Sequence, residues 1–139
     1  STLKGKTFIN LRSDYGSTWR GEFIIRNCRF VPTNGKNVTV SLLKGYNSGQ
    51  HDFGYTCFMP QRIIIDSLYV DDSNLPEDYS GPTVFGDFNS EFTDNTYVEK
   101  YPYIITKEVI LRNVETASGK KIRISANPYM FRNVTVNVE

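Results

Sequence analysis

The sequence predicts an all-β chain in which short strands recur as similar units stacked on one another. Three observations support this prediction. Arg-Asn followed by a small apolar residue occurs at Arg26, Arg112 and Arg132, each time after a run of β-branched or aromatic residues. Apolar residues alternate with period two on both sides of each Asn, which is typical of strands. No long segment has the 3.6-residue apolar period of an amphipathic helix.

The first element in each unit is a long run that bends at its Asn. With Asn27, Asn113 and Asn133 as a common origin, the flanking apolar residues fall into columns, and residues 62–70 fit the same columns with Ser67 at the origin. The residues two before and one after the origin are both apolar, so the strand must bend there. Asn and Ser tolerate the left-handed backbone and bond to neighbouring groups, so we expect the four origins to form a ladder. The columns at −4, −2, +1 and +3 contain Phe23, Ile63, Val109 and Tyr129; Ile25, Ile65, Leu111 and Phe131; Cys28, Leu68, Val114 and Val134; and Phe30, Val70, Thr116 and Val136.

The second element is a further β-like run after each bend, at residues 37–43, 82–88 and 120–125. Strand, bend, strand and loop would make one coil. The origins are 40, 46 and 20 residues apart, so the last spacing predicts a bare coil, and the first two predict insertions or an extra short strand. Units of this length bury their apolar face only by stacking, as in solenoids.

The 139 residues fit one domain over 1–139, or the C-terminal piece of a longer chain, with insertions at about 44–60 and 71–106. A third apolar column, at −3, should point away from the coil interior. Either a loop or the N-terminal segment KTFINL covers this column, or it is a surface for a neighbouring subunit. A homo-oligomer or further domains of a parent chain are therefore expected partners. The column contains Ile24, Ile64, Ile110 and Met130.

Charge and cysteine content exclude several classes of function. The net charge is +1, with 16 basic and 15 acidic residues intermixed, so neither nucleic acid nor a membrane is an expected partner. Cys28 and Cys57 lack the spacing of a zinc motif, and whether they form a bridge stays open. Aromatic residues make up 14% of the chain and are abundant in both insertions.

These columns resemble the right-handed parallel β-helix proteins of the pectate-lyase-like superfamily, over residues 21–139. The resemblance implies a parallel β-helix of few coils with long loop insertions. Hydrolases of this family carry Asp-Asp, Gly-His-Gly and Arg-Ile-Lys motifs; Asp71-Asp72 matches the first, whereas GQHDFG and KIRIS match neither of the others. The alternative is an antiparallel β-sandwich of jelly-roll type, which explains the composition but not the columns.

Function is expected on the two insertions, because loops interrupting a scaffold usually carry the site. Both insertions combine flat rings with short polar groups, a mixture suited to sugar rings and their hydroxyls. Catalytic candidates are Asp71, Asp72 and His51. The loop carboxylates could hold Ca²⁺, although the EF-hand pattern is missing and no other metal or cofactor is expected. The expected carbohydrate-binding residues are Tyr46, His51, Phe53, Tyr55, Asp71, Asp72, Asp87, Tyr97 and Tyr101.

The resulting hypothesis is a non-catalytic, carbohydrate-contacting β-helix module. It would belong to an extracellular polysaccharide-processing protein or a phage adhesion protein, at a cell or virion surface, with a polysaccharide or glycan as partner. Two alternatives stay open: a lyase or glycoside hydrolase acting on acidic polysaccharide, and a structural segment of a fibre or tail spike.

Overall fold

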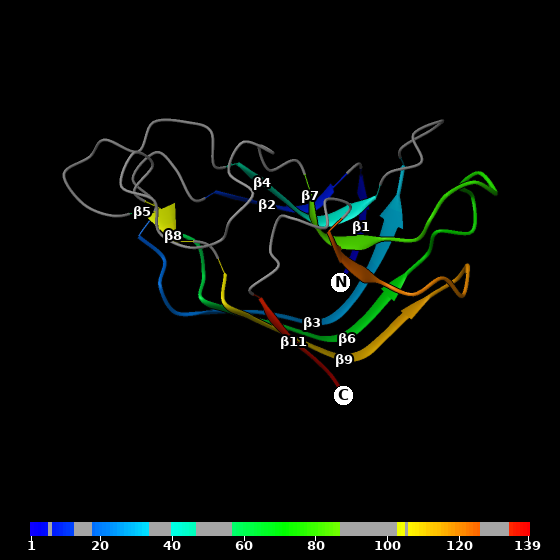
Figure 1. The fold of residues 1–139 in the computed structure, drawn as a ribbon. Helices are drawn as coiled ribbons and strands as arrows, with labels where there is room; N and C mark the ends of the chain where they lie inside the picture. Colours follow the sequence, from blue (N-terminus) through cyan, green and yellow to red (C-terminus); the bar gives the residue numbers. More distant parts are fainter. Residues whose placement is uncertain are drawn as a thin grey trace.

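The computed structural model describes residues 1–5, 7–12, 18–33, 40–46, 57–86, 103–104, 106–125 and 134–139. This part of the chain is all-β, with parallel sheets and no helix. The largest sheet has five strands in the order β1-β3-β6-β9-β11 (Figure 1). Its strands are β1 (Thr2–Gly5), β3 (Glu22–Pro32), β6 (Arg62–Val70), β9 (Glu108–Thr116) and β11 (Thr135–Val138).

A four-stranded sheet in the order β10-β7-β4-β2 lies across from the first (Figure 1). The chain passes from one sheet to the other and back, so strands that are neighbours in a sheet are not neighbours in the sequence. A short pair, β5 and β8, forms a third sheet inside the two expected insertions. The strands of these sheets are β2 (Thr7–Arg12), β4 (Ser41–Tyr46), β7 (Thr83–Gly86), β10 (Arg123–Ser125), β5 (Cys57–Phe58) and β8 (Tyr103–Ile104).

All strand pairings within the described ranges are parallel. The antiparallel sandwich is therefore wrong for this part of the chain, because its strands would return by hairpins and pair antiparallel. The expected second runs are confirmed as β4, β7 and β10. The extra short strand allowed for in the longer units is confirmed as β5 and β8.

The predicted columns are confirmed for the three long strands. Phe23 pairs with Ile63 and Ile63 with Val109, and the columns at −2, +1 and +3 follow the same register. Most of their members are buried in one apolar core, where Ile65, Leu68 and Phe30 are almost fully enclosed. The opposing wall of this core comes from β4 and β7, and Phe8 of β2 reaches Phe30 with ring centroids 5.4 Å apart.

The predicted alignment of the last unit is wrong. Asn133 lies outside the described residues, but Val136 pairs with Val109, an offset of 27 residues rather than 20. Alternation decides this register, since it places Val136 and Val138 in the columns of Val109 and Leu111. The three shared letters Arg-Asn-Val at Arg132 therefore did not mark an equivalent corner.

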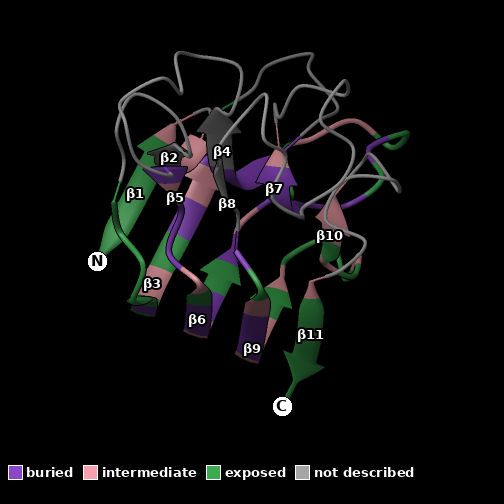
Figure 2. Cartoon of the chain, turned by 60° about the vertical axis from the view of Figure 1, so that its left-hand side comes forward, coloured by how far each residue is buried: buried purple, intermediate pink, exposed green. Residues whose placement is uncertain are grey.

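The outward column at −3 is mostly not exposed. Ile64 and Ile110 are buried, whereas Ile24, nearer the edge of the sheet, is 49% exposed; Met130 lies outside the described ranges. The segment KTFINL does not serve as the cover, because it contributes strand β2 to the other sheet, with Phe8 and Ile9 on the core. Figure 2 shows the outermost strands, β1 and β11, as largely exposed.

Candidate functional site

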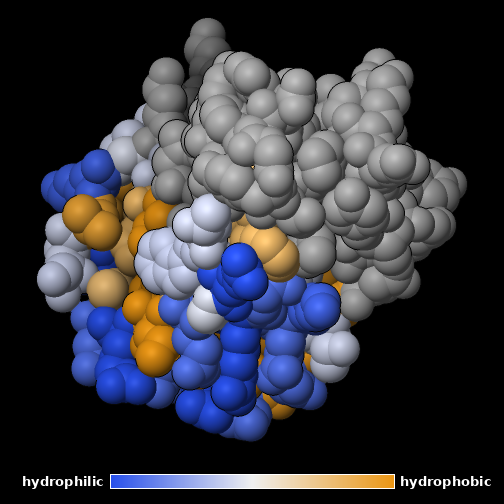
Figure 3. Space-filling model, turned by 90° about the vertical axis from the view of Figure 1, so that its left-hand side faces the viewer, coloured by the Kyte–Doolittle hydropathy of each residue, from blue (hydrophilic) through white to orange (hydrophobic). Residues whose placement is uncertain are grey.

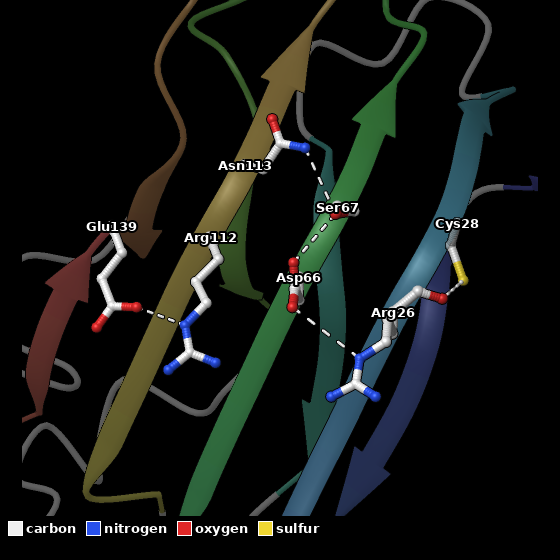
Figure 4. A network of polar contacts seen from close by, with 7 residues as sticks. All are labelled: Arg26, Cys28, Asp66, Ser67, Arg112, Asn113 and Glu139. Carbon is white, nitrogen blue, oxygen red and sulfur yellow. Dashed lines mark hydrogen bonds and ion pairs between the residues drawn. The ribbon is translucent and has the colours of Figure 1, made fainter.

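The bend in the long strands is built by three residues in the left-handed backbone region. Asn27, Ser67 and Asn113 have φ of 55°, 59° and 50° and sit inside β3, β6 and β9. This conformation costs about 1–2 kcal/mol for an ordinary residue, and Asn reduces the cost by local hydrogen bonds. The origins of the three long strands are thus confirmed as corners. Asn113 Nδ2 donates to Ser67 Oγ at 3.4 Å, so these two side chains form a ladder between strands (Figure 4).

The bend divides the outward side of the five-stranded sheet into two surfaces. The charged face is defined by the outward charged residues before the bend, and the tyrosine face by those two positions after it. The charged face consists of Glu22, Arg26, Arg62, Asp66, Glu108 and Arg112, and the tyrosine face of Arg29, Tyr69 and Glu115.

The charged face alternates in sign from strand to strand. Arg62 reaches both neighbours in its column: Nη1 lies 3.3 Å from Glu22 Oε2, and Nε lies 3.6 Å from Glu108 Oε1. Opposite charges facing one another across a ladder stabilise the pairing, and like charges would destabilise it. These pairs are partly exposed and contribute at most about 1 kcal/mol each.

The column nearest the bend continues the alternation to the end of the sheet. Arg26 Nε lies 4.0 Å from Asp66 Oδ2, and Arg112 Nε donates to Glu139 Oε2 (Figure 4). The hydrogen bond with Glu139 raises the pKa of Arg112, and the charge of Asp66 adds to the effect. Ser67 Oγ donates to Asp66 Oδ1 at 3.0 Å, which links this column to the ladder at the bend. The charges on this face are therefore matched by neighbours in the fold.

The tyrosine face presents a ring that is not covered. Tyr69 is 38% exposed, and the guanidinium carbon of Arg29 lies 5.5 Å from its ring centroid. Glu115 follows in the same row on β9. Beside the ring lies a hollow of about 170 Å³, which Ser67, Asn113 and Glu115 help to line. Hydroxyl, amide and carboxylate groups thus surround one edge of an exposed aromatic ring.

Asp71 ends this surface and fixes Arg29. Arg29 Nη2 donates to Asp71 Oδ2 at 2.5 Å, and Ser73 Oγ donates to Oδ1 at 2.8 Å. The hydrogen bonds from Ser73 and Arg29 lower the pKa of Asp71 below its ordinary value. Asp71 is therefore an anion that positions Arg29 beside Tyr69.

Asp72 has a different environment from its neighbour. It is buried, and both of its oxygens accept from Ser118: the backbone N donates to Oδ1 and Oγ to Oδ2, each at 2.7 Å. Asp71 and Asp72 are thus held by different elements, β3 and the turn after β9. The structure does not join them into an acid/base pair, and Asp72 clasps two connecting segments together.

A second hollow, of about 530 Å³, lies beside this clasp and is lined in part by Asp72, Glu77, Tyr79 and Lys120. Lys120 Nζ donates to the carbonyl oxygens of Glu77, at 3.0 Å, and of Tyr79. The Tyr79 hydroxyl is buried, and burial together with the charge of Asp72 raises its pKa. Because Lys120 and Asp72 already bond to neighbouring groups, this hollow serves mainly to hold its own loop.

Most of the site residues expected on the insertions cannot be compared. The backbone of Tyr46 belongs to β4, but its side chain lies outside the described residues. His51, Phe53, Tyr55, Asp87, Tyr97 and Tyr101 also lie outside them. Sequence reasoning missed Arg29, Tyr69 and Glu115, although the column two after the origin would have placed all three outward in one row.

Cysteine and metal chemistry are not evident in the described part of the chain. Cys28 on β3 and Cys57 on β5 are both free thiols. The described residues contain no group of three or more His, Cys, Asp or Glu side chains that could hold a metal ion. They also contain no helix long and apolar enough to span a membrane.

The described residues thus define an all-β protein of parallel sheets whose candidate site is an exposed sheet face. Comparison with family models, with curated proteins and with solved structures finds no match to this chain.

Proposed function

We propose that the chain is a right-handed parallel β-helix and that its tyrosine face binds a carbohydrate without cleaving it. The repeated passage between the two sheets supports the β-helix, because each passage adds one parallel strand to each sheet. Right-handed crossovers are the rule for parallel strands in one sheet. The repeat along the sequence agrees with this arrangement for the three long strands.

The observation that carries the carbohydrate proposal is the exposed ring of Tyr69, held by Arg29 beside a polar hollow. A sugar ring has apolar C–H faces that pack on aromatic rings, and hydroxyls that need donors and acceptors at the edge. Asn113, Ser67 and Glu115 supply such groups within one hollow. The parallel strands lie about 4.8 Å apart, so successive rows offer groups at a spacing suited to an extended polymer.

A polysaccharide ligand would place the protein outside the cell, or at a cell or virion surface. It would act there as a module of a polysaccharide-processing or phage adhesion protein. The alternative of a lyase or hydrolase is less well supported, because Asp71 and Asp72 are held by Arg29 and Ser118 and do not converge on one ligand.

The test is binding of the 139-residue chain to plant, bacterial-wall and host polysaccharides on a glycan array and in affinity gels. Tyr69→Phe keeps the ring and is expected to bind like wild type. Tyr69→Ala removes the ring and should weaken binding about tenfold, since aromatic packing contributes about 0.5–1.5 kcal/mol beyond its buried area. Circular dichroism and thermal unfolding check that the variants fold.

The proposal fails if the folded wild type binds none of the polysaccharides, or if Tyr69→Ala binds as well as Tyr69→Phe. Release of reducing ends or unsaturated products by the wild type would favour the enzyme alternative instead.

A further inference from the structure

The inward columns of the five-stranded sheet end in solvent on both sides. Val138 of β11 pairs with Leu111 and continues a column whose inner members are buried, yet it is 77% exposed. Leu3 of β1 pairs with the fully buried Phe30, yet it is 45% exposed. Solenoids whose end units lack a polar cap expose their core in this way. Both ends of the stack therefore present apolar groups that fit another layer.

The two end strands cover opposite halves of their neighbours. β1 pairs with Arg29–Pro32, the part of β3 after the bend. β11 pairs with Glu108–Leu111, the part of β9 before the bend. Within the described ranges, each end of the sheet therefore has a step, and the two steps are complementary in position.

We propose that a second copy of this chain stacks head to tail on the first. In this arrangement β11 of one copy lies beside the first half of β3 of the next copy. β1 of the next copy lies beside the second half of β9. Together, β11 and the neighbouring copy's β1 complete one layer that neither copy completes alone. In the four-stranded sheet, β10 would meet β2 of the next copy, since these are the outer strands of that sheet.

Apolar contacts favour this pairing over a random one. The register places Val138 in the column of Ile25 of the next copy, so the buried column would continue across the junction. A hollow of about 560 Å³ at the same end, lined in part by Val114, Ile122 and Val138, would receive Leu3 of the next copy. Burying such surface contributes about 25 cal/mol per Å².

Charges also match across the junction. The column nearest the bend runs Arg26, Asp66, Arg112, Glu139, and the next residue in a stack would be Arg26 of the following copy. The alternation of sign would continue without a like-charge pair. In the other charged column, Thr135 would separate Glu108 from Glu22 of the next copy.

Trp19 supplies an observable at this junction. It is the only tryptophan in the chain, stands edge-on to Phe23 with centroids 5.1 Å apart, and donates its indole N–H to Glu22 O at 3.1 Å. Its ring is partly exposed at the end that would receive β11, so stacking should bury it against Val136. Because the two faces differ, such a contact is heterologous and builds open chains of copies rather than a closed dimer.

The experiment uses two variants that each block one end. Leu3→Lys charges the β1 end, and Val138→Lys charges the β11 end. By sedimentation velocity, wild type should associate further as concentration rises, and each variant alone should stay monomeric. An equimolar mixture should form a heterodimer that grows no further, because each variant retains one functional end. Tryptophan emission should shift to shorter wavelength in the mixture, since Val138→Lys contributes the Trp19 that becomes covered.

Ile24→Lys is the matched control, since it charges an exposed aliphatic on the outward side of β3 rather than at an inward column. This variant should associate like wild type. The proposal is overturned if wild type stays monomeric at millimolar concentration, which would leave both ends to other segments or partners. It is also overturned if either blocked variant still self-associates, if the mixture stays monomeric, or if Ile24→Lys alone abolishes association. Polysaccharide binding by Tyr69 is measured separately and can fail or succeed independently.

Discussion

Before the bend, the outward charged side chains of the three long strands pair with one another; beyond it, the outward row leaves a ring and a hollow exposed. On the charged face, Arg62 binds a glutamate on each side. On the tyrosine face, Tyr69 has Arg29 against its ring but remains more than one-third exposed. Figure 3 shows the surface on one side of the molecule, where hydrophilic side chains dominate and hydrophobic ones emerge between them. The same strands thus use one half for stability and leave the other available for a ligand.

The largest effect is expected from removing the bend that separates the two faces. Asn113→Val forces a β-branched residue into the left-handed region and removes the bond to Ser67. We expect it to lower the free energy of unfolding by about 2 kcal/mol. Asn113→Gly loses the same bond but adopts the backbone freely, so its loss should be smaller, about 0.5–1 kcal/mol. Urea unfolding of both variants measures the difference, and equal losses would show that the backbone conformation is not what Asn113 provides.

This corner was also the most predictable feature of the fold. Asn27, Ser67 and Asn113 could be found from sequence because a residue tolerant of positive φ coincides with a slip in apolar parity. That physical constraint acts within a few residues, so it is visible locally. The last unit was misaligned because Arg-Asn-Val at Arg132 repeats the letters, while the register follows the alternation of Val136 and Val138.

The candidate site was less predictable, for a different reason. Asp71 and Asp72 attracted attention as adjacent carboxylates, but residues next to one another in an extended chain point to opposite sides, and they bind Arg29 and Ser118. Tyr69 and its neighbours are 40 or more positions apart in sequence and meet only through strand pairing. Nothing in a single segment reports such a row, although the alignment of the units contained it.

The second prediction breaks the charge alternation on the charged face. Arg62→Glu would place three glutamates in one row, with Glu22 and Glu108 on either side. Like charges directly opposite one another destabilise a sheet, and we expect a loss of about 1–2 kcal/mol at low salt. The loss should shrink markedly in 1 M NaCl, where screening is strong.

Arg62→Gln is the neutral control for that variant. It removes two partly exposed ion pairs without adding repulsion, so its cost should stay below about 1 kcal/mol. If Arg62→Glu and Arg62→Gln unfold at the same urea concentration at low salt, the alternation of sign has no role in stability.

The smallest effect is expected from Asp71, which joins the tyrosine face to the loop after β6. Hydrogen bonds from Ser73 and Arg29 keep its folded-state pKa below the ordinary value of 3.8, so the folded chain favours the carboxylate. The resulting stability is complete above the unfolded-state pKa and is lost as pH falls through the lower folded-state pKa. Asp71→Asn should therefore be slightly less stable than wild type from pH 5 to 7, and the difference should narrow below pH 4. Urea unfolding across this range, with carboxyl NMR of Asp71, measures it. A Ser73→Ala variant should raise the Asp71 pKa toward 3.8, because it removes the largest cause of the shift; an unchanged pKa would mean that Ser73 does not hold this carboxylate.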